Sequence, residues 1–330
     1  FLSVTFYLLG GGVFGYVPER NPGYGSARFG ETHLKNVNVY DSLFYNGARN
    51  KSNYASAEDG TLGYISPLGS FVGGKEETNK SITLKSCKVI GTKVYGNNHI
   101  SGFISAVFYG AELNNCFVTD TTLCGTGGHS GGVLSCAADT CVCRECFSNI
   151  SMFSSKQAGG FSGTVGGTFD RCYSTGKLEG YSAIGGFMEI GGGILTNCYS
   201  TMLVGMRSAS NNMGGFIGRT RLVTQMQNCY AAGEVGDTKT DSRTKLIGNN
   251  STGAGGFTRM IQDTPVITNC YYDKQTTAMR EWVTAEKNEE RGDSVDGITG
   301  VLTTTTNKSG TGLTANEEEI KKAKSGFKGF

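Results

Sequence analysis

Several features are scarce in this 330-residue chain, and each scarcity excludes a class of protein or site. Proline occurs only 4 times beside 51 glycines. The glycines do not recur at every third position, which excludes a collagen-like triple helix. The net charge is only +2, without a basic patch or polybasic run, so we expect no nucleic-acid footprint and no membrane-surface anchor. No stretch approaches the ~20 apolar residues of a membrane span. The three histidines, His33, His99 and His129, are scattered and form no recognisable Ser/His/Asp order.

The chain contains instead a repeat built from two short motifs. One clear copy is Gly159-Gly160-Phe161-Ser162-Gly163 followed by Asp170-Arg171-Cys172-Tyr173-Ser174-Thr175-Gly176. Further copies are marked by the pairs Phe187 and Cys198, Phe216 and Cys229, and Phe257 and Cys270, with weaker ones at Phe103 and Cys116, Val133 and Cys146, and Val72 and Cys87. In all but the weakest copy the pair is 11 or 13 residues apart, and this difference of two keeps the alternation of a strand in phase.

A repeat of this length cannot bury its apolar face alone, so stacking of successive copies is expected. The sequence therefore predicts an all-β fold, a parallel β-solenoid (β-helix) of about seven to nine coils. Irregular lead-in or capping coils are expected over 1–65, the repeat array over 66–280, and a polar C-terminal capping or linker segment over 281–330. A short helix is expected in that segment from Thr314 to Lys324, because Thr314 and Glu317 fit a capping box. The polar insertion from Gly236 to Thr252 is expected to project as a loop.

The positions around the cysteine predict how each coil is oriented. Three residues before it stands a mostly large apolar residue, which we expect in the core: Leu84, Leu113, Cys143, Phe169, Leu195, Met226 and Ile267. The residue two before is polar, which indicates exposure. Directly before the cysteine comes an asparagine in four copies, Asn115, Asn197, Asn228 and Asn269, and asparagine tolerates the left-handed conformation of a corner. The glycine before each phenylalanine is expected to supply the same conformation at another corner.

The residue after the cysteine is aromatic in six copies, and these six are the predicted binding residues: Phe117, Phe147, Tyr173, Tyr199, Tyr230 and Tyr271. If the cysteines point inward, strand alternation turns the rings outward, where an aromatic ladder would bind glycan or protein. If the asparagine is not a corner, the rings join the core. The sequence leaves both directions open.

The cysteines are the most tempting candidates for chemistry. Seven of the eleven belong to the ladder, and we expect them to be unpaired and buried, because stacked thiols ~4.8 Å apart and parallel suit a disulfide poorly. The other four, Cys124, Cys136, Cys141 and Cys143, lie near His129 in the sequence. They could be packed thiols, form one or two disulfides, or hold zinc, although the paired Cys-x-x-Cys spacing of a zinc knuckle is absent. No metal and no cofactor are predicted.

The acidic residues give little sign of an active site. A glycoside hydrolase needs two carboxyl groups facing one groove about 5–10 Å apart. Asp170, Glu179 and Glu189 lie near one another in the sequence, but no acidic residue recurs in register. No catalytic residue is predicted.

The motifs Gly-Gly-Phe-x-Gly and Asn-Cys-Tyr-Ser/Ala-Thr/Ala-Gly resemble the GLUG-motif repeat of bacterial surface proteins, most closely over 159–273. The resemblance implies a surface-exposed β-solenoid and supplies no catalytic residues. We therefore expect a non-enzymatic structural or adhesion protein, extracellular on a cell surface or virion, with a glycan, a host or cell-surface protein, or neighbouring subunits as partners. A phage tail fibre or virion decoration protein is one alternative, and a polysaccharide-degrading β-helix enzyme is another.

Overall fold

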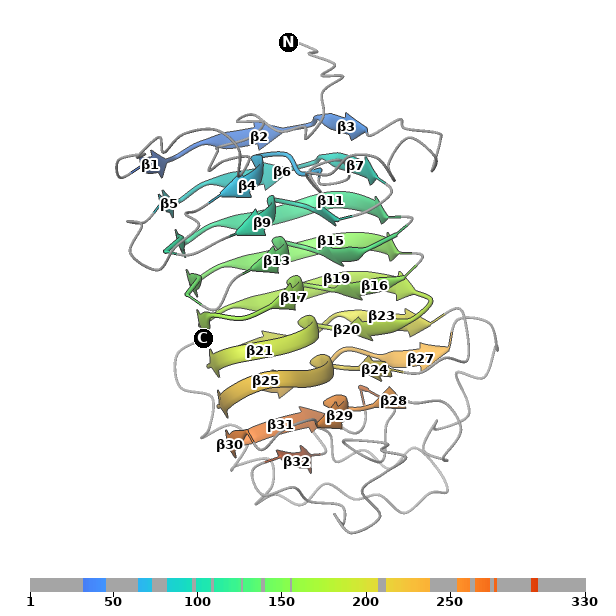
Figure 1. Ribbon diagram of the computed structural model, residues 1–330. Helices are drawn as coiled ribbons and strands as arrows, with labels where there is room; N and C mark the ends of the chain where they lie inside the picture. The colour runs from blue at the N-terminus through green and yellow to red at the C-terminus, as the bar shows by residue number, and fades with distance from the viewer. Residues whose placement is uncertain are drawn as a thin grey trace, which may run out of the picture.

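The computed structural model is a parallel β-solenoid whose turns stack from one end to the other (Figure 1). The structure describes residues 32–45, 65–72, 82–96, 99–107, 110–125, 127–137, 140–154, 156–206, 212–237, 254–261, 265–273, 276–277 and 298–301. These residues form strands joined by turns and bends, and every strand pair among them is parallel. The predicted all-β solenoid is thereby confirmed.

Three sheets run along the stack. In sheet A, the strands after the glycine motif are β4 (Gly69–Val72), β9 (Ile104–Val107), β13 (Leu134–Ala137), β17 (Ser162–Val165), β21 (Met188–Thr196), β25 (Ile217–Gln227) and β29 (Thr258–Ile261). The strands before the cysteine complete it: β1 (Thr32–Lys35), β5 (Ile82–Lys85), β10 (Glu112–Asn114), β14 (Val142–Arg144), β18 (Thr168–Asp170) and β30 (Val266–Thr268). The long strands β21 and β25 serve both parts of this sheet.

Sheet B follows the cysteine, and sheet C precedes the glycines. Sheet B contains β2 (Asn38–Tyr40), β3 (Leu43–Tyr45), β6 (Lys88–Ile90), β7 (Lys93–Gly96), β11 (Phe117–Gly125), β15 (Phe147–Ser154), β19 (Tyr173–Gly180), β22 (Tyr199–Ser200), β23 (Leu203–Met206), β26 (Tyr230–Ala231), β27 (Val235–Asp237), β31 (Cys270–Asp273) and β32 (Ile298–Val301). Sheet C contains β8 (Ile100–Ser101), β12 (His129–Gly131), β16 (Gln157–Gly159), β20 (Ala183–Gly185), β24 (Asn212–Gly214) and β28 (Ala254–Gly255).

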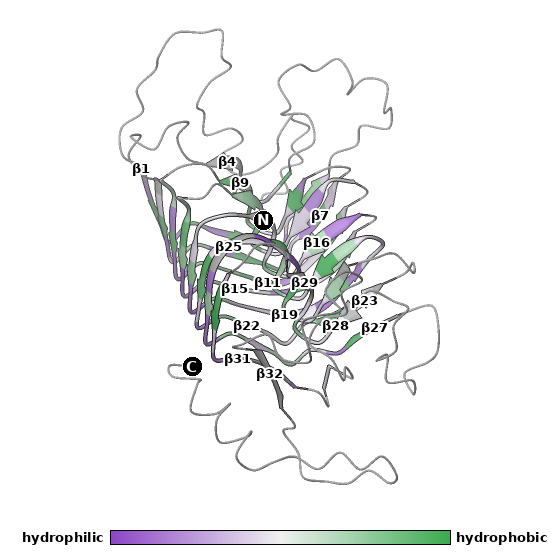
Figure 2. Cartoon of the chain, turned by 60° about the horizontal axis from the view of Figure 1, so that its bottom comes forward, coloured by the Kyte–Doolittle hydropathy of each residue, from purple (hydrophilic) through white to green (hydrophobic). Residues whose placement is uncertain are grey.

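The described residues make about five complete turns, which begin at β8, β12, β16, β20 and β24, with partial turns at both ends. This is fewer than the seven to nine coils expected. Equivalent residues lie in register from turn to turn, as with Phe169, Leu195 and Met226. Figure 2 looks obliquely along the stack and shows the hydropathy of the strands recurring from one turn to the next.

The core consists of ladders of identical or similar side chains. The phenylalanines of the glycine motif stack with centroids 4.8 Å apart for Phe161 and Phe187, and 5.0 Å for Phe187 and Phe216. The residues three before the cysteine are all buried, which confirms their predicted direction. Cys172, Cys198 and Cys229 lie on successive turns, as the flanking register and the backbone hydrogen bonds between these turns require.

The asparagine corner is confirmed. Asn115, Asn197, Asn228 and Asn269 all have φ between 51° and 55°, in the left-handed region. Their side chains also form a ladder, because the Asn228 amide donates to Asn197 Oδ1 at 3.0 Å and Asn269 donates to Asn228 Oδ1 at 3.4 Å. Each corner is therefore fixed both by its own backbone and by its neighbour.

The glycines before phenylalanine were predicted to adopt the left-handed conformation, and this prediction is wrong. Among the described residues Gly160, Gly186 and Gly215 are not in the positive-φ region. They are needed because adjacent turns approach closely: a Cβ at Gly160 would lie 2.0 Å from the Gly186 carbonyl oxygen, and one at Gly186 would lie 2.0 Å from that of Gly215. The glycines thus allow sheet C to meet sheet A at a tight corner.

Three further expectations fall at the edges of the described residues. Residues 32–45, inside the predicted lead-in segment, pair in register with 82–95 as an ordinary part of the stack. Gly236 and Asp237 belong to β27, so the predicted loop begins after them, and its remainder lies outside the described residues. The predicted helix from Thr314 to Lys324 also lies outside them, whereas β32 in the same C-terminal segment pairs with β31.

Candidate functional site

The six predicted binding residues stand in one column on sheet B, and the structure settles their direction. The column runs in register through Phe117, Phe147, Tyr173, Tyr199, Tyr230 and Tyr271. The preceding cysteine and the following residue, such as Cys172 and Ser174, are buried, and alternation therefore turns the ring to the outer face of the sheet. The rings of the first five residues are half-buried there.

The rings are stacked face to face along the solenoid axis. Three consecutive pairs, from Phe117 to Tyr199, have centroids 4.7 Å apart and interplanar angles of 10°, 2° and 5°. The Lys88 ammonium lies 5.0 Å from the centroid of the Phe117 ring, on the N-terminal side of the stack. The faces of the inner rings are thus occupied by their neighbours, and what remains for a partner is a stripe of ring edges and tyrosine hydroxyls.

Burial makes these hydroxyls less acidic than ordinary phenols. It raises the pKa of Tyr173 above its ordinary value, and it raises the pKa of Tyr199 to about 12, with the nearby Tyr173 adding to the effect. The pKa of Tyr230 is raised as well, by burial first and then by the charge of Asp273. The phenols are therefore neutral hydrogen-bond groups at physiological pH.

Tyr271 differs from the other five members of the column. Only 2% of the residue is exposed, and it lies opposite Thr299 of β32, the strand that pairs with β31. Tyr271 accordingly supports the end of the ladder and offers no surface for contact. The exposed stripe runs from Phe117 to Tyr230.

The seven ladder cysteines are buried and unpaired, as predicted. Their thiols lie near backbone carbonyls of their own and the preceding turn; the Cys116 Sγ is 3.4 Å from the oxygen of Asn114 and 3.5 Å from that of Leu84. Burial raises the pKa of Cys146 and Cys172 well above the ordinary value. A thiol without thiolate character is a poor nucleophile, so this ladder serves packing.

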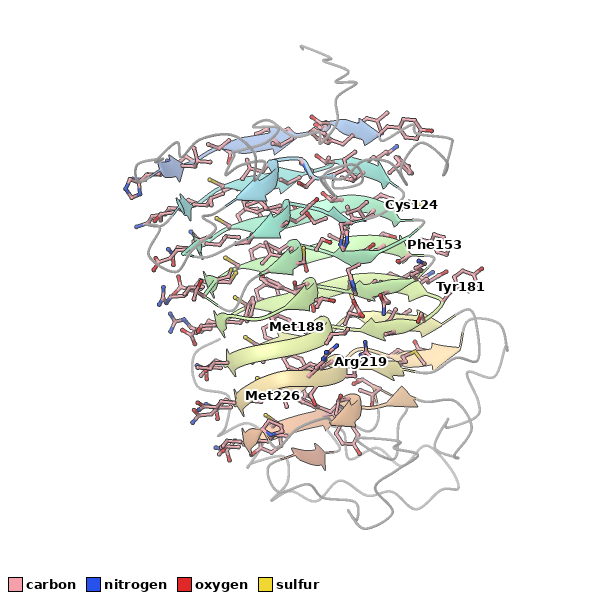
Figure 3. The ribbon with its side chains drawn as sticks, viewed as in Figure 1. Cys124, Phe153, Tyr181, Met188, Arg219 and Met226 are labelled. Carbon is pink, nitrogen blue, oxygen red and sulfur yellow. The ribbon has the colours of Figure 1, made fainter. Side chains whose placement is uncertain are left out.

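Among the remaining four cysteines, Cys124, Cys141 and Cys143 are also free thiols. Cys141 and Cys143 are buried with their Sγ atoms 3.9 Å apart, whereas Cys124 and Cys136 are partly exposed. Cys124 lies at the same end of sheet B as Phe153 and Tyr181 (Figure 3). Within the part of the chain that the structure describes, no three His, Cys, Asp or Glu side chains gather as a metal site would require. Packed thiols are the alternative that the structure contains.

The three carboxylates considered for catalysis have separate partners. Asp170 on β18 accepts a hydrogen bond from the Asn197 amide at 3.1 Å, and Glu179 on β19 pairs with Lys177. Glu189 on β21 is fully buried and pairs with His129.

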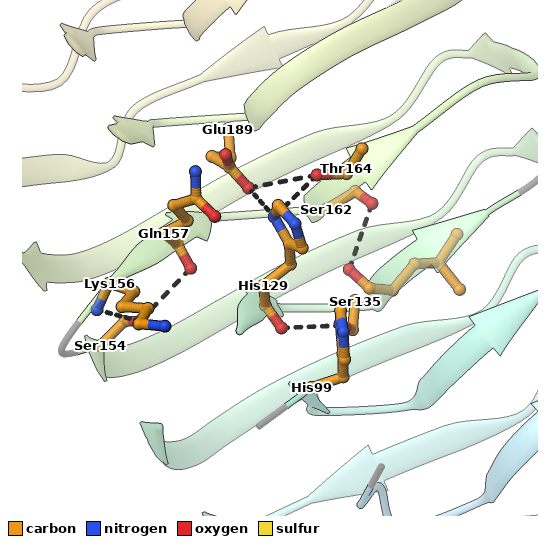
Figure 4. A network of polar contacts seen from close by, with 10 residues as sticks. His99, His129, Ser135, Ser154, Lys156, Gln157, Ser162, Thr164 and Glu189 are labelled. Carbon is orange, nitrogen blue, oxygen red and sulfur yellow. Dashed lines mark hydrogen bonds and ion pairs between the residues drawn. The ribbon is translucent and has the colours of Figure 1, made fainter. Parts of the chain in front are cut away.

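A polar cluster around His129 and Glu189 is the feature that sequence reasoning missed (Figure 4). His129 Nδ1 lies 2.6 Å from Glu189 Oε2 and 2.8 Å from the hydroxyl of Thr164, and that hydroxyl is 3.3 Å from the same carboxylate oxygen. His99 stacks on His129 with centroids 5.4 Å apart, and its Nδ1 is 3.2 Å from the Ser135 hydroxyl. The Ser135 hydroxyl in turn donates to the carbonyl of His129 at 2.8 Å.

The pair between His129 and Glu189 passes over an intervening turn. His129 belongs to β12, Glu189 to β21, and the turn between them carries Gly163 at the position equivalent to Glu189. A Cβ at Gly163 would lie 3.1 Å from His129 Cβ, so the missing side chain leaves the space that the pair occupies. Glu189 occupies the position that Ser105 and Ser135 occupy in earlier copies of the repeat. This change from serine to a charged residue was the one sign of the cluster in the sequence.

Four buried side-chain polar atoms among the described residues have no hydrogen-bond partner: Ser101 Oγ, Ser130 Oγ, Glu189 Oε1 and Arg219 Nε. Arg219 lies one turn further along the stack than Glu189, on β25 (Figure 3). An unpartnered buried polar atom costs about 1–3 kcal/mol, and more when it belongs to a charged group. The unpartnered Oε1 of Glu189 therefore destabilises the folded protein.

The cluster is not a hydrolytic triad. In such a triad the acid holds one imidazole nitrogen and the nucleophile contacts the other. Here the carboxylate and the hydroxyl of Thr164 both approach Nδ1 of His129. The arrangement instead brings a hydroxyl, an imidazole and a carboxyl group within contact of one another.

The described residues contain no helix long and apolar enough to cross a membrane. The chain matches no model of a known protein family, no curated protein and no solved structure.

Proposed function

We propose that the chain is a non-enzymatic structural and adhesion protein, which acts on a cell surface or virion as a rigid spacer with one contact face. The observation that carries this proposal is the use of side chains for stacking. Cysteines, phenylalanines, asparagines and the outer aromatic rings each form ladders along the axis, instead of converging on a ligand.

Such stacking suits a rigid spacer. Backbone hydrogen bonds join each turn to the next, and every central turn has a neighbour on both sides. An aromatic pair contributes about 0.5–1.5 kcal/mol beyond its buried area, so the two aromatic ladders add to the stability of each turn. The inert buried thiols add packing without reactivity.

The contact face is the stripe from Phe117 to Tyr230 on the outer side of sheet B. A sugar ring that binds an aromatic residue usually lies flat on its face, but here the ring faces are covered by their neighbours. Ring edges and hydroxyl groups on a flat sheet suit a protein surface, where aromatic residues commonly dominate contacts. A protein on a host or cell surface, or a neighbouring subunit, is therefore the partner that this geometry favours over a glycan.

The location outside the cell rests on the resemblance of the repeat to the GLUG motif of bacterial surface proteins. Free thiols are uncommon in oxidising compartments. The ladder cysteines are compatible with such a compartment because burial shields them and keeps their pKa high.

Binding is tested with the labelled chain on arrays of surface proteins and of glycans, together with sedimentation for self-association. We expect binding to protein or to itself, reduced at least tenfold by a double Phe147→Ser, Tyr173→Ser variant. Thr175→Ser, on the same strand and outer face, is the matched control and should bind as the wild type does. Binding confined to glycans, or a signal unchanged in the double variant, would contradict the proposed face.

The non-enzymatic part is tested separately by incubating the chain with a panel of polysaccharides and measuring released oligosaccharides. We expect no release. Release by the wild type that is lost in Asp170→Asn or Glu189→Gln would establish the enzyme instead.

A further inference from the structure

The cluster of Thr164, His129 and Glu189 has the composition of a condensation site. The Thr164 hydroxyl is 3.3 Å from Glu189 Oε2, and both groups contact His129 Nδ1, at 2.8 Å and 2.6 Å. Thr164 lies on β17 and Glu189 on β21, adjacent turns of sheet A. We propose that Thr164 and Glu189 form an intramolecular ester crosslink between these turns, with His129 transferring the proton.

The protonation state that the reaction needs is available within the pair. A proton shift from His129 Nδ1 to Glu189 Oε2, across 2.6 Å, turns the ion pair into a neutral imidazole and a neutral carboxylic acid. This shift changes no net charge and moves one proton between two atoms that are already in contact. The neutral acid is an electrophile, and the neutral imidazole is a base that lies beside the hydroxyl of Thr164.

The steps balance without an oxidant or a further reactant. Thr164 Oγ1 attacks Cδ of Glu189 while His129 Nδ1 accepts the hydroxyl proton, which gives a tetrahedral intermediate. His129 then returns that proton to the hydroxyl group on Cδ, the C–O bond to this group breaks, and one water molecule leaves. The products are an Oγ1–Cδ ester and a neutral imidazole.

The geometry also lowers the barrier to the reaction. Well-oriented intramolecular partners reach effective molarities of about 10⁵–10⁸ M, because little entropy remains to be lost when the two groups react. Glu189 is fully buried, whereas 27% of the His129 side chain is exposed, so the departing water has a short path to solvent on the histidine side.

The orphaned Glu189 Oε1 is an independent reason to expect the crosslink. In the carboxylate, this buried oxygen shares a negative charge and has no hydrogen-bond partner. In the ester the charge is gone, and a carbonyl oxygen without a partner costs less than a carboxylate oxygen without one. His99, stacked on the other side of His129, holds the imidazole in place.

The crosslink is read from the intact mass of the full chain, purified and then denatured. After prolonged incubation at neutral pH, we expect a mass lower than that of the sequence by one water molecule, and a peptide map that joins the segments containing Thr164 and Glu189. Hydroxylamine, which cleaves esters, should restore two separate peptides. A wild-type chain that keeps its full mass, with no joined peptides, would overturn the proposal.

Matched variants separate the ester from other losses of water. Thr164→Val removes the hydroxyl at nearly constant shape and should abolish the joined peptides, whereas Thr164→Ser should retain them. Thr168→Val, on the next strand of the same turn, should leave them unchanged. His129→Gln should slow their appearance at least tenfold. Loss of water that persists in Thr164→Val would indicate a succinimide at an aspartate and would count against the ester. This test does not depend on whether the chain is an adhesin.

Discussion

His129 and Glu189 are 60 residues apart, yet Nδ1 of the one lies 2.6 Å from Oε2 of the other, across a turn that has Gly163 at the position equivalent to Glu189. The contact joins the first and third of three consecutive turns. Most ladders in the solenoid join neighbouring turns, so this pair couples a longer section of the stack than any single ladder step does. The stability of that section should therefore depend on the glycine that makes room for the pair.

We expect Gly163→Ala to destabilise the protein by about 1–3 kcal/mol, the usual cost of overpacking a filled site. The new methyl group would meet the Ser135 carbonyl oxygen at 2.4 Å and His129 Cβ at 3.1 Å, and the first of these is backbone that cannot easily move. Chemical denaturation monitored by circular dichroism measures the shift in midpoint.

Gly236→Ala is the matched control for this experiment. An added Cβ there meets nothing within 4 Å, so a change within about 0.5 kcal/mol is expected. If both variants shift the denaturation midpoint equally, the missing side chain of Gly163 is not what stabilises the protein at this position.

Acid should weaken the fold through His99. Burial first, and then the neighbouring His129, lower the pKa of His99 from 6.5 to about 4. Between these values the unfolded chain binds a proton that the folded chain refuses, so the free energy of unfolding falls as the pH drops from about 6.5 to about 4. The groups that face His99 are His129 on the next turn, the Ser135 hydroxyl and, beyond His129, Glu189.

Denaturation midpoints measured at intervals from pH 7 to pH 4 test this dependence. His99→Gln should reduce the slope over this interval, because glutamine does not titrate. His33→Gln, at an exposed histidine of the first described strand, should keep the wild-type slope. An unchanged slope in His99→Gln would show that the acid sensitivity arises elsewhere.

Thiol reactivity should divide the cysteines into two classes. Cys124 and Cys136 are partly exposed, whereas Cys172 and Cys198 are fully buried, and burial raises the pKa of both. Under native conditions a thiol reagent should modify Cys124 and Cys136 first, and reach Cys172 and Cys198 only after denaturation. Peptide mapping assigns the modified residues, and Cys124→Ser should remove one rapidly reacting thiol. Equal native rates for Cys198 and Cys124 would contradict the buried ladder.

The repeat made most of the fold predictable. A motif that places phenylalanine, asparagine, cysteine and an aromatic residue at fixed spacing yields stacked ladders once the strands are parallel, and the direction of the residue three before the cysteine follows from its apolar character. The left-handed asparagine corner follows from the conformational tolerance of that side chain. These are properties of each copy by itself, which is why the sequence reveals them.

What the sequence could not show depends on relations between copies. The pair of His129 with Glu189 exists because one copy has glycine where the next has glutamate, and a comparison of copies for what they share discards such differences. The glycines before phenylalanine were assigned to a positive φ, whereas the cause is the approach of two backbones, visible only once the turns are stacked. The direction of the aromatic ladder likewise depended on the asparagine corner, and the pairing of Tyr271 with Thr299 of β32 joins segments that are distant in the sequence.

The corner ladder offers a stabilising substitution. Glu145 occupies the asparagine position of its copy with φ of 54°, a conformation that costs an ordinary L-residue roughly 1–2 kcal/mol and asparagine less. Its recorded partner is Arg171, 3.0 Å away, in an ion pair whose side chains are 59% and 40% exposed, and such a pair contributes about 0–1 kcal/mol. We expect Glu145→Asn to raise the free energy of unfolding by about 0.5 kcal/mol, the difference between these effects.

Glu145→Gln removes the ion pair but keeps the backbone strain, and so should be slightly destabilising. The converse change, Asn228→Glu, should destabilise more than either, because it introduces strain and breaks the amide contact with Asn197 at 3.0 Å. Thermal denaturation of the three variants beside the wild type ranks them, and a Glu145→Asn protein no more stable than Glu145→Gln would show that the corner conformation is not what favours asparagine.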